Sequence, residues 1–483
     1  MGRRRKKYNP PFEVDITSLG RKGVGVGEAP DGLPVEVKFA PPGARLLVAP
    51  NQKKKDRWRA RRVEMISPPP DAVEPPCKVF GLCGGCNLQE LGLETQRYHK
   101  WQYALNAVAE PMGWTLDEMQ EQVKVHPVRG TKEAYRYRNK VEFSWGSRRI
   151  LNQEEFDAGT SFHGRFLGFH APGHYDRIAD TDQCYLISEA GNTLLGTLRT
   201  QTLHDGSPSV WDAREHTGFW RHAMIRQGFA TGELMVVVYT KSPTNEEEVA
   251  AVEQVAQALL ETELPDSAKL VGVIWVVNDS VADVAQGEPR QIWGSDELEE
   301  RLGDVSYRLS IRTFFQTSTE GAVVLYDTIK EALHNSSSTL YDLYCGTGSI
   351  GLYVGHDFQK IVGIEEVPEA IEDAKRNAEA NAITWATYHA SAMENALAHL
   401  PSAEERAALV VDPPRVGLHP KVAKALAKAN GDPLVYVACH PPSLGRDGAI
   451  LREGGWKLTD LWAVDLFPQT GHIEVVGRFV KDT

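Results

Sequence analysis

The stretch LYDLYCGTGSIGLYV (residues 340–354) decides the fold of the carboxyl-terminal part of the chain. An apolar run leads into a glycine-rich turn and then a helix-like segment, with Gly346, Gly348 and Gly351 in the spacing G-x-G-x-x-G. Such a strand–turn–helix unit lets a ligand approach backbone N–H groups where the helix begins. Glu365 ends the next apolar run, where a carboxylate can accept hydrogen bonds from ribose hydroxyls. Folds that bind NAD and folds that bind S-adenosylmethionine share both features, so these residues leave the two ligands open.

Apolar strands alternate with helix-like segments from about residue 305 onward. Strands are indicated by KIVGIE (360–365), ALVVDPP (408–414) and PLVYVAC (433–439), and helices by PEAIEDAKRNAEAN (368–381) and HPKVAKALAKAN (419–430). This alternation predicts an α/β fold with a doubly wound parallel sheet.

The segment VVDPPRVGLHP (410–420) favours one of the two ligands. An acidic residue and two prolines at the carboxyl end of a strand are typical of nucleotide methyltransferases. The prolines stiffen the turn and remove backbone donors, while Asp412 offers an acceptor to a polar partner. A dehydrogenase has no evident use for this pattern, although a purely structural turn is an alternative. We therefore predict a Rossmann-like S-adenosylmethionine-dependent methyltransferase domain over residues 301–483.

The amino-terminal region differs in charge from the rest of the chain. The net charge of the protein is −12, yet residues 1–65 contain 16 Lys and Arg against 7 Asp and Glu. Residues 11–66 read as five short strands separated by glycine turns, which predicts an OB-like β-barrel behind a basic tail, residues 1–10. The burst KKKDRWRARR (53–62) combines phosphate-binding cations with Trp58, on which a base can stack. An RNA-binding barrel is the expectation, and a solvated basic surface is the alternative.

A mixed α+β central domain is expected over residues 67–300, after the proline-rich linker SPPPDAVEPP (67–76). It contains Cys77, Cys83 and Cys86 within ten residues and Cys184 far along the chain. Three thiolates separated by glycines indicate a metal or cluster site. An iron–sulfur cluster takes four thiolates, whereas structural zinc more often uses paired C-x2-C ligands. The pattern favours a cluster, with zinc and chance burial as alternatives.

The ordered set of motifs resembles the RNA uracil-5-methyltransferase family over nearly the whole chain. The motifs are CGGC (83–86), FFQ (314–316), DLYCGTGSIGL (342–352), GIE (363–365), DPPR (412–415), a cysteine before a proline-rich turn (439–442) and GHIE (471–474). The greatest similarity is to the branch that has a TRAM domain and a [4Fe–4S] cluster and methylates 23S ribosomal RNA. Two positions depart from the family pattern, since Ser318 and His440 stand where Asn is usual.

The resemblance implies a role for each matched position. Cys439 would be the nucleophile and Glu474 the proton acceptor. Contacts to S-adenosylmethionine are implied for Gln316, Tyr344, Ser349, Glu365 and Asp412. The four cysteines Cys77, Cys83, Cys86 and Cys184 would hold the [4Fe–4S] cluster, and the barrel would be a TRAM domain.

Methylation of uracil at C5 explains why these residue types are needed. A thiolate that adds to C6 makes C5 nucleophilic, and a base must later remove the C5 proton. An ordinary cysteine is mostly protonated at neutral pH, so we hypothesise that Arg446 or His440 assists ionisation. The target uridine must leave its stack to be reached.

The remaining expectations concern substrate and location. A uridine in 23S ribosomal RNA is the expected target, and a transfer RNA uridine or a non-catalytic RNA-binding role are the alternatives. No run of about 18 apolar residues is present, and no apolar stretch follows the basic start. We therefore expect a cytoplasmic protein, monomeric and without membrane contact.

Overall fold

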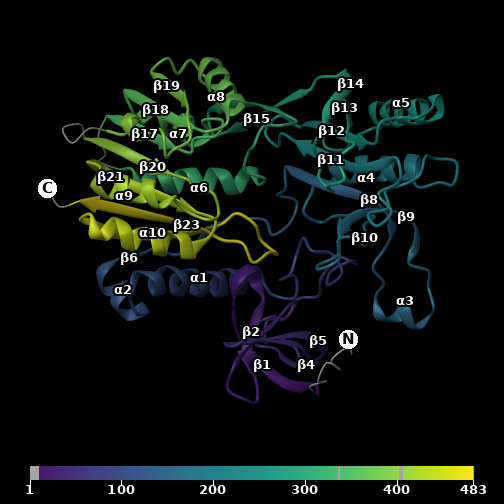
Figure 1. Ribbon diagram of the computed structural model, residues 1–483, viewed down its shortest axis with the longest axis horizontal. Helices are drawn as coiled ribbons and strands as arrows, with labels where there is room; N and C mark the ends of the chain where they lie inside the picture. Colours follow the sequence, from purple (N-terminus) through teal and green to yellow (C-terminus); the bar gives the residue numbers. More distant parts are fainter. Residues whose placement is uncertain (1–9, 335–337, 402–405, 482–483) are drawn as a thin grey trace, which may run out of the picture.

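The computed structural model describes residues 10–334, 338–401 and 406–481. Three bodies are visible in Figure 1: a small barrel, a central sheet, and a larger sheet covered by helices on both faces. The predicted basic tail, residues 1–10, lies outside the described residues apart from Pro10. No helix of the described ranges is long and apolar enough to span a membrane.

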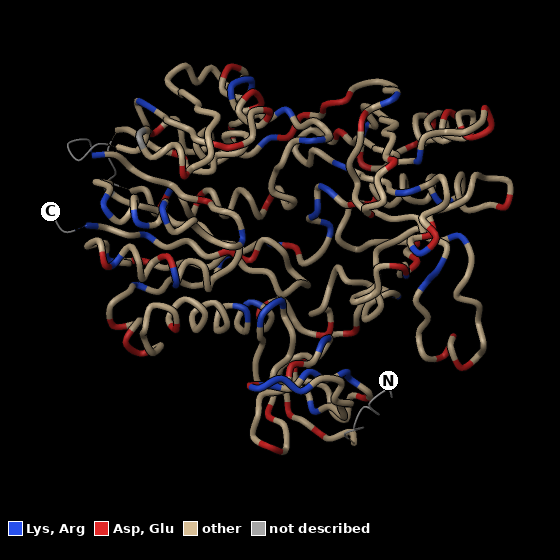
Figure 2. Tube along the Cα trace, in the orientation of Figure 1, with Lys and Arg blue, Asp and Glu red and all other residues tan. Residues whose placement is uncertain are grey.

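The barrel closes in the order β1-β2-β3-β5-β4. Its strands are β1 (Phe12–Leu19), β2 (Gly25–Glu28), β3 (Pro34–Val37), β4 (Arg45–Lys53) and β5 (Trp58–Ser67). Alternate side chains such as Val14, Val35 and Leu46 fill its core, as the two-residue period of a strand requires. Figure 2 shows Lys and Arg recurring along this module. The predicted five-stranded barrel is present.

The central sheet has the order β10-β9-β8-β11-β12-β13-β14. Its strands are β8 (Lys140–Arg148), β9 (His163–His170), β10 (Ile178–Asp180), β11 (Trp220–Gln227), β12 (Glu233–Thr240), β13 (Lys269–Val277) and β14 (Glu288–Gly294). The helices of this region are α3 (Gln153–Asp157), α4 (Glu189–Thr202) and α5 (Glu246–Leu260). α4 and α5 cover one face, where residues such as Phe143, Trp145 and Val236 form a core.

The large sheet runs β19-β18-β17-β20-β21-β23-β22-β6. Its main strands are β17 (Thr339–Leu343), β18 (Lys360–Glu365), β19 (Ala386–Ala390), β20 (Ala407–Val411), β21 (Gly431–Ala438), β22 (Trp456–Asp465) and β23 (Glu474–Lys481). β17 to β21 are parallel, and β23 pairs antiparallel with β21 and β22. The strand order reverses at β17, which is the point where open α/β sheets bind their ligands.

Helices cover both faces of the large sheet, and its central strands β20 and β21 are accordingly buried and mostly apolar. The helices are α6 (Thr319–Ala332), α7 (Ser349–Val354), α8 (Pro368–Ala380), α9 (Pro420–Lys428) and α10 (Pro441–Glu453). α6, α7 and α8 contribute to the core on one side, while α9 and α10 contribute to the core on the other. The α/β fold predicted for this part of the chain is confirmed.

One segment crosses the expected boundary at residue 300. The elements α1 (Leu93–Ala109), α2 (Leu116–Gln122), β6 (Lys124–Val125) and β7 (Arg129–Gly130) precede the central sheet in sequence. β6 and β7 nevertheless pair with β22, and α1 packs on α10 through Trp101, Leu105 and Val108. A hairpin of β15 (Glu297–Leu302) and β16 (Val305–Ser310) joins the two sheets. The segment around α1 therefore lies with the large sheet.

Candidate active site

The carboxyl ends of the parallel strands bring the predicted catalytic and cofactor residues to one edge of the large sheet. Glu365 ends β18, Tyr344 follows β17, Asp412 follows β20 and Cys439 follows β21. Glu474 reaches the same edge because β23 is antiparallel and begins there. Ala438 pairs with Val475, so the register continues to Cys439 opposite Glu474. Residues more than a hundred positions apart thus meet because of sheet topology.

The two implied catalytic groups lie in a poorly solvated environment. Cys439 is half-buried and Glu474 is only 6% exposed. Burial is the main cause that raises the pKa of the Cys439 thiol to about 12, and the charge of Glu474 adds to it. Burial and the neighbouring Asp412 raise the pKa of Glu474 to about 8, and burial raises that of Asp412 to about 7. The edge therefore favours the neutral forms of these groups.

Arg415 is the cation that opposes these shifts. Its charge lowers the pKa of both Cys439 and Glu474, although burial outweighs it. Arg446, which we expected to assist the thiol, pairs with Asp447 at 2.7 Å and donates to the Val416 carbonyl at 2.8 Å.

His440 cannot replace Arg415 as a source of positive charge. Burial and nearby arginines lower the pKa of His440, so its ring is neutral at physiological pH. The residue precedes α10 without capping the helix through its side chain. Arg415, within the quoted DPPR motif, is thus the residue that the sequence interpretation passed over.

The glycine loop after β17 is built around two carboxylates. Glu365 accepts hydrogen bonds from the N–H of Gly346 at 3.1 Å and from Val367 at 2.9 Å. Asp342 is buried and accepts from the N–H of Gly351 at 2.8 Å. Gly351 is required there, because a Cβ would lie 2.8 Å from the Asp342 carboxylate. The loop therefore starts α7 with backbone donors and carboxylates facing one site.

Asp342 has a feature that indicates a missing partner. One of its carboxylate oxygens, Oδ1, is buried without a hydrogen-bond partner among the described residues. Burial raises the pKa of this carboxyl to about 7. A buried acceptor left unpaired costs free energy, so a polar ligand group would satisfy it.

The other implied cofactor residues occupy different positions around the loop. Ser349 begins α7 and accepts a hydrogen bond from the Tyr326 hydroxyl at 2.9 Å. Gln316 is half-buried before α6, and its carbonyl accepts from Asn139 at 2.9 Å. Ser318 caps α6 by accepting from the N–H of Gly321 at 3.2 Å. Asn caps a helix equally well. The capping of α6 therefore explains why Ser318 can stand where the family usually has Asn.

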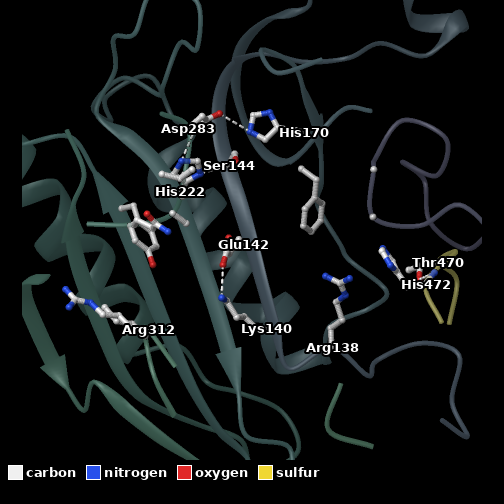
Figure 3. Close-up of a pocket in the computed structure, with 18 of the residues that line it drawn as sticks. Arg138, Lys140, Glu142, Ser144, His170, His222, Asp283, Arg312, Thr470 and His472 are labelled. Atoms are coloured by element: carbon white, nitrogen blue, oxygen red, sulfur yellow. Dashed lines mark hydrogen bonds and ion pairs between the residues drawn. The ribbon is translucent and has the colours of Figure 1, made fainter. Parts of the chain in front are cut away.

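A large pocket of about 1150 Å³ opens beside this edge. Its walls come from the barrel, the cysteine loop, the central sheet and the segments around Arg415 and His472. Figure 3 shows Lys140 and Glu142 on β8, with their ion pair drawn, and Arg138 just before this strand. Lys140 Nζ lies 2.9 Å from Glu142 Oε1. The lining of the pocket thus includes Lys22 of the barrel and Arg415 near the candidate active site.

Asp283 holds two histidines at the upper end of the pocket in Figure 3. Its carboxylate oxygens lie 3.1 Å from His170 Nε2 and 3.0 Å from His222 Nε2. These two histidines hold the pKa of Asp283 well below its usual range, against the opposing effect of burial. The Ser144 hydroxyl lies 3.1 Å from the other ring nitrogen of His222.

The four clustered cysteines come together despite their separation in sequence. Cys77, Cys83, Cys86 and Cys184 line one cavity of about 40 Å³ between the cysteine loop and the central sheet. Burial raises the pKa of all four thiols, so they are neutral in the absence of a metal. Within the described ranges, no three His, Cys, Asp or Glu side chains are arranged to hold a single metal ion.

Comparison with known proteins decides the family. A family model described as tRNA (Uracil-5-)-methyltransferase matches residues 292–482. An uncharacterized RNA methyltransferase of Chlorobaculum tepidum is 35% identical over 478 residues, which cover 97% of this chain and 96% of the relative. Another, from Halalkalibacterium halodurans, is 32% identical over 472 residues, with 97% and 96% covered. The chain belongs to the RNA uracil-5-methyltransferase family.

The whole architecture is also similar to a solved structure. The tRNA (uracil-54, C5)-methyltransferase of Pyrococcus abyssi, in complex with S-adenosyl-L-homocysteine, has a TM-score of 0.72 and 25% sequence identity. The match covers 97% of this chain and 100% of that one. The predicted family, Rossmann-like methyltransferase fold and enzyme class are confirmed.

Proposed function

We propose that this methyltransferase modifies C5 of a specific uridine in 23S ribosomal RNA through a covalent adduct with Cys439. The observation that supports the adduct is the register of β21 and β23, which sets Cys439 opposite Glu474 at the sheet edge. Nucleophile and base are needed on the same ring, so this juxtaposition is the geometry the chemistry requires.

The protein's own residues account for the bond changes. The Cys439 thiolate adds to C6 of the uracil ring, and the electron pair of the C5–C6 double bond makes C5 nucleophilic. Bound S-adenosylmethionine supplies the methyl group that C5 receives. Glu474 then removes the C5 proton, the C6–S bond breaks, the double bond forms again and the thiolate leaves. Arg415 favours the charged forms of both Cys439 and Glu474.

The proposed cofactor site takes Gln316, Tyr344, Ser349, Glu365 and Asp412. The unpaired oxygen of Asp342 supports a polar ligand in the glycine loop. Glu365 lies at the end of β18, where a carboxylate accepts bonds from ribose hydroxyls.

The cluster of cysteines is proposed as the ligand set of a [4Fe–4S] cluster. Four thiols around one cavity fit this group, because such clusters are held by four cysteine thiolates. Protein purified without oxygen should be brown and contain about four iron atoms per chain. Colourless protein containing zinc would contradict the proposal.

The barrel is proposed as a TRAM domain that holds RNA flanking the target. Its positive charge and its border on the large pocket, through Lys22, support this role. We infer a monomer in the cytoplasm, where RNA is available.

A transfer RNA uridine is the second candidate substrate. It is favoured by the similarity to the P. abyssi enzyme, whose name gives a tRNA target. One experiment distinguishes the two substrates. Total RNA from cells that lack the protein is incubated with the enzyme and methyl-labelled cofactor, and the labelled positions are then mapped. Label in 23S RNA supports the proposal, and label in tRNA alone replaces it with the second candidate.

The base has a separate test. Glu474→Gln should accumulate a covalent protein–RNA adduct on denaturing gels, because the C5 proton can no longer be removed. Glu366→Gln, an exposed neighbour on the same edge, is the matched control and should turn over normally. If Glu474→Gln turned over without an adduct, Glu474 would not be the base.

A further inference from the structure

The loop between β22 and β23 carries the chain directly into Glu474, and its backbone is held from several sides. The carbonyl of Phe467 accepts from Lys100 Nζ at 3.1 Å, and the carbonyl of Pro468 accepts from the Tyr137 hydroxyl at 2.8 Å. Lys100 comes from α1, whereas Tyr137 precedes β8 of the central sheet. Successive carbonyls are therefore fixed by different parts of the molecule.

Gln469 is the most constrained residue of this loop. Its carbonyl accepts from the N–H groups of Asn87 at 2.9 Å and Leu88 at 3.1 Å, immediately after Cys86. Its φ angle is +68°, a left-handed conformation that costs a non-glycine residue free energy. Such a conformation persists only where surrounding contacts impose it.

A reciprocal pair of hydrogen bonds joins Gln469 to Gln96 of α1. Gln96 Nε2 donates to Gln469 Oε1 at 3.0 Å, and the N–H of Gln469 donates to Gln96 Oε1 at 2.8 Å. Both side chains are buried. The same Nε2 lies 3.1 and 2.8 Å from the carbonyl oxygens of Leu88 and Leu91, so its two hydrogens are shared among three acceptors. One amide thus joins α1, the turn after the cysteine loop and the loop before Glu474.

The barrel contacts the same loop two residues after Gln469, at Gly471. A Cβ on Gly471 would lie 2.0 Å from the backbone nitrogen of Gly23, so only glycine fits. Gly23 ends the short helical turn η1 (Arg21–Gly23) of the barrel. Asn87 Nδ2 donates to the Lys22 carbonyl at 2.6 Å, which ties this turn to the cysteine loop.

We propose that Gln96 and Gln469 are positioning residues that place Glu474 for removal of the C5 proton. Only four residues separate Gln469 from Glu474, so a displaced Gln469 backbone moves the start of β23. The proposal rests on the proposed role of Glu474 as base. It assigns the amide pair a function in the elimination step, beyond holding the fold.

Two variants test the pair without introducing charge. Gln96→Met keeps the length of the side chain but removes its amide. Gln469→Asn keeps an amide and a residue type that tolerates positive φ, but shortens its reach. The control is Gln102→Met, on the same helix and half-buried. Steady-state kinetics and the fraction of protein in the covalent RNA adduct are measured for each, beside Glu474→Gln.

For both test variants, kcat should fall about 10–100-fold while KM for RNA changes less than about threefold. Because the lost step is elimination, adduct should accumulate toward the level of Glu474→Gln. A purely structural role would lower activity without accumulating adduct, and that result would overturn the proposal. Activity equal to that of Gln102→Met would overturn it as well.

The results also distinguish failure of the positioning role of Gln96 and Gln469 from failure of the proposed role of Glu474 as base. Adduct with Glu474→Gln but none with the two glutamine variants rejects only the positioning role. No adduct with Glu474→Gln rejects the base, and the positioning role with it. If Gln96→Met failed to fold, Gln469→Asn would decide, since it leaves α1 unchanged.

Discussion

The two large sheets of this protein offer their functional groups in different ways. The catalytic sheet is covered by helices on both faces, so its polar groups gather where strands end, at Glu365, Asp412 and Cys439. α4 and α5 cover one face of the central sheet, whereas part of its other face, with Met224, Val237 and Ile274, is buried in a core with the β15–β16 hairpin. Lys140, Glu142 and other polar residues of its opposite face line the large pocket. The proposed chemistry thus lies at a sheet edge, and the proposed RNA-binding surface lies on a sheet face.

The difference follows from how each sheet buries its strands. A parallel strand that is apolar on both faces can place functional side chains only at its end. An antiparallel strand with one open face can present every second residue, as Lys140, Glu142 and Ser144 do on β8. A substitution at the edge should therefore reduce methyl transfer strongly by itself. A substitution on the sheet face should change RNA binding only slightly, because many residues share that role.

The largest effect is expected at the edge, for Cys439→Ala. Without the nucleophile no adduct forms, so methyl transfer should fall by about 10⁴-fold or more. RNA affinity, measured by fluorescence anisotropy, should stay within about threefold because the binding face is unchanged. Methyl transfer at a tenth of the normal rate would contradict covalent catalysis.

The next effect concerns Arg415→Gln. Arg415 lowers the pKa of Cys439 and Glu474, so its loss raises both pKa values and reduces the charged forms at neutral pH. A shift of one pKa unit changes the charged fraction of a group about tenfold, so kcat/KM at pH 7 should fall at least about tenfold. The part of the loss that comes from Glu474, whose pKa is about 8, should recover toward pH 9. Arg415→Lys keeps the charge and should retain most activity. A loss that did not shrink at all between pH 7 and pH 9 would show that Arg415 does not act on the ionisation of Glu474.

The sequence predicted the edge better than the face. Asp412 and Cys439 each end an apolar run before prolines, so local pattern and parallel topology together bring them to one edge. Gln469 carries no such signal, because its partner Gln96 is 373 positions away and both look like ordinary polar residues. The sequence assigns the α1 segment to the central domain, although it lies with the large sheet. Its pairing strands, such as β6, are only two residues long and show no periodic pattern in the sequence. Pairing across such distances depends on the assembled fold.

A smaller effect is expected on the open face, from the Lys140–Glu142 pair. Lys140→Gln should weaken RNA binding a few-fold and reduce the slope of log K against log salt by about one. Glu142→Gln removes a negative charge from the same strand and should strengthen binding slightly. Titrations between 50 and 300 mM salt measure both. Changes of the same sign in the two variants would show that this face does not meet the phosphate backbone.

The smallest expected effect concerns protein stability. Ionisation of the buried Glu474 carboxyl should lower stability, whereas ionisation of the exposed Glu142 carboxyl should change it little. Glu474 has a pKa of about 8 in the folded protein and an ordinary value of 4.5, so the folded state binds more protons between these values. Stability contributed by the neutral form is therefore present below pH 4.5 and is lost as pH rises through 8. Gln cannot ionise, so Glu474→Gln should raise Tm relative to the natural protein by a few degrees at pH 9 and by nothing near pH 4.5.

Differential scanning calorimetry at pH 5, 7 and 9 measures this difference in Tm. Glu142→Gln, where the carboxylate is half-exposed beside Lys140, should show no growing difference over the same range, because exposed pairs contribute little. If the Tm difference for Glu474→Gln stayed flat with pH, the carboxyl would be paired in solution and the edge would bury no uncompensated charge. A difference that grows with pH would show that the edge buries the Glu474 carboxyl at a cost in stability, which the exposed Glu142 carboxylate on β8 does not incur.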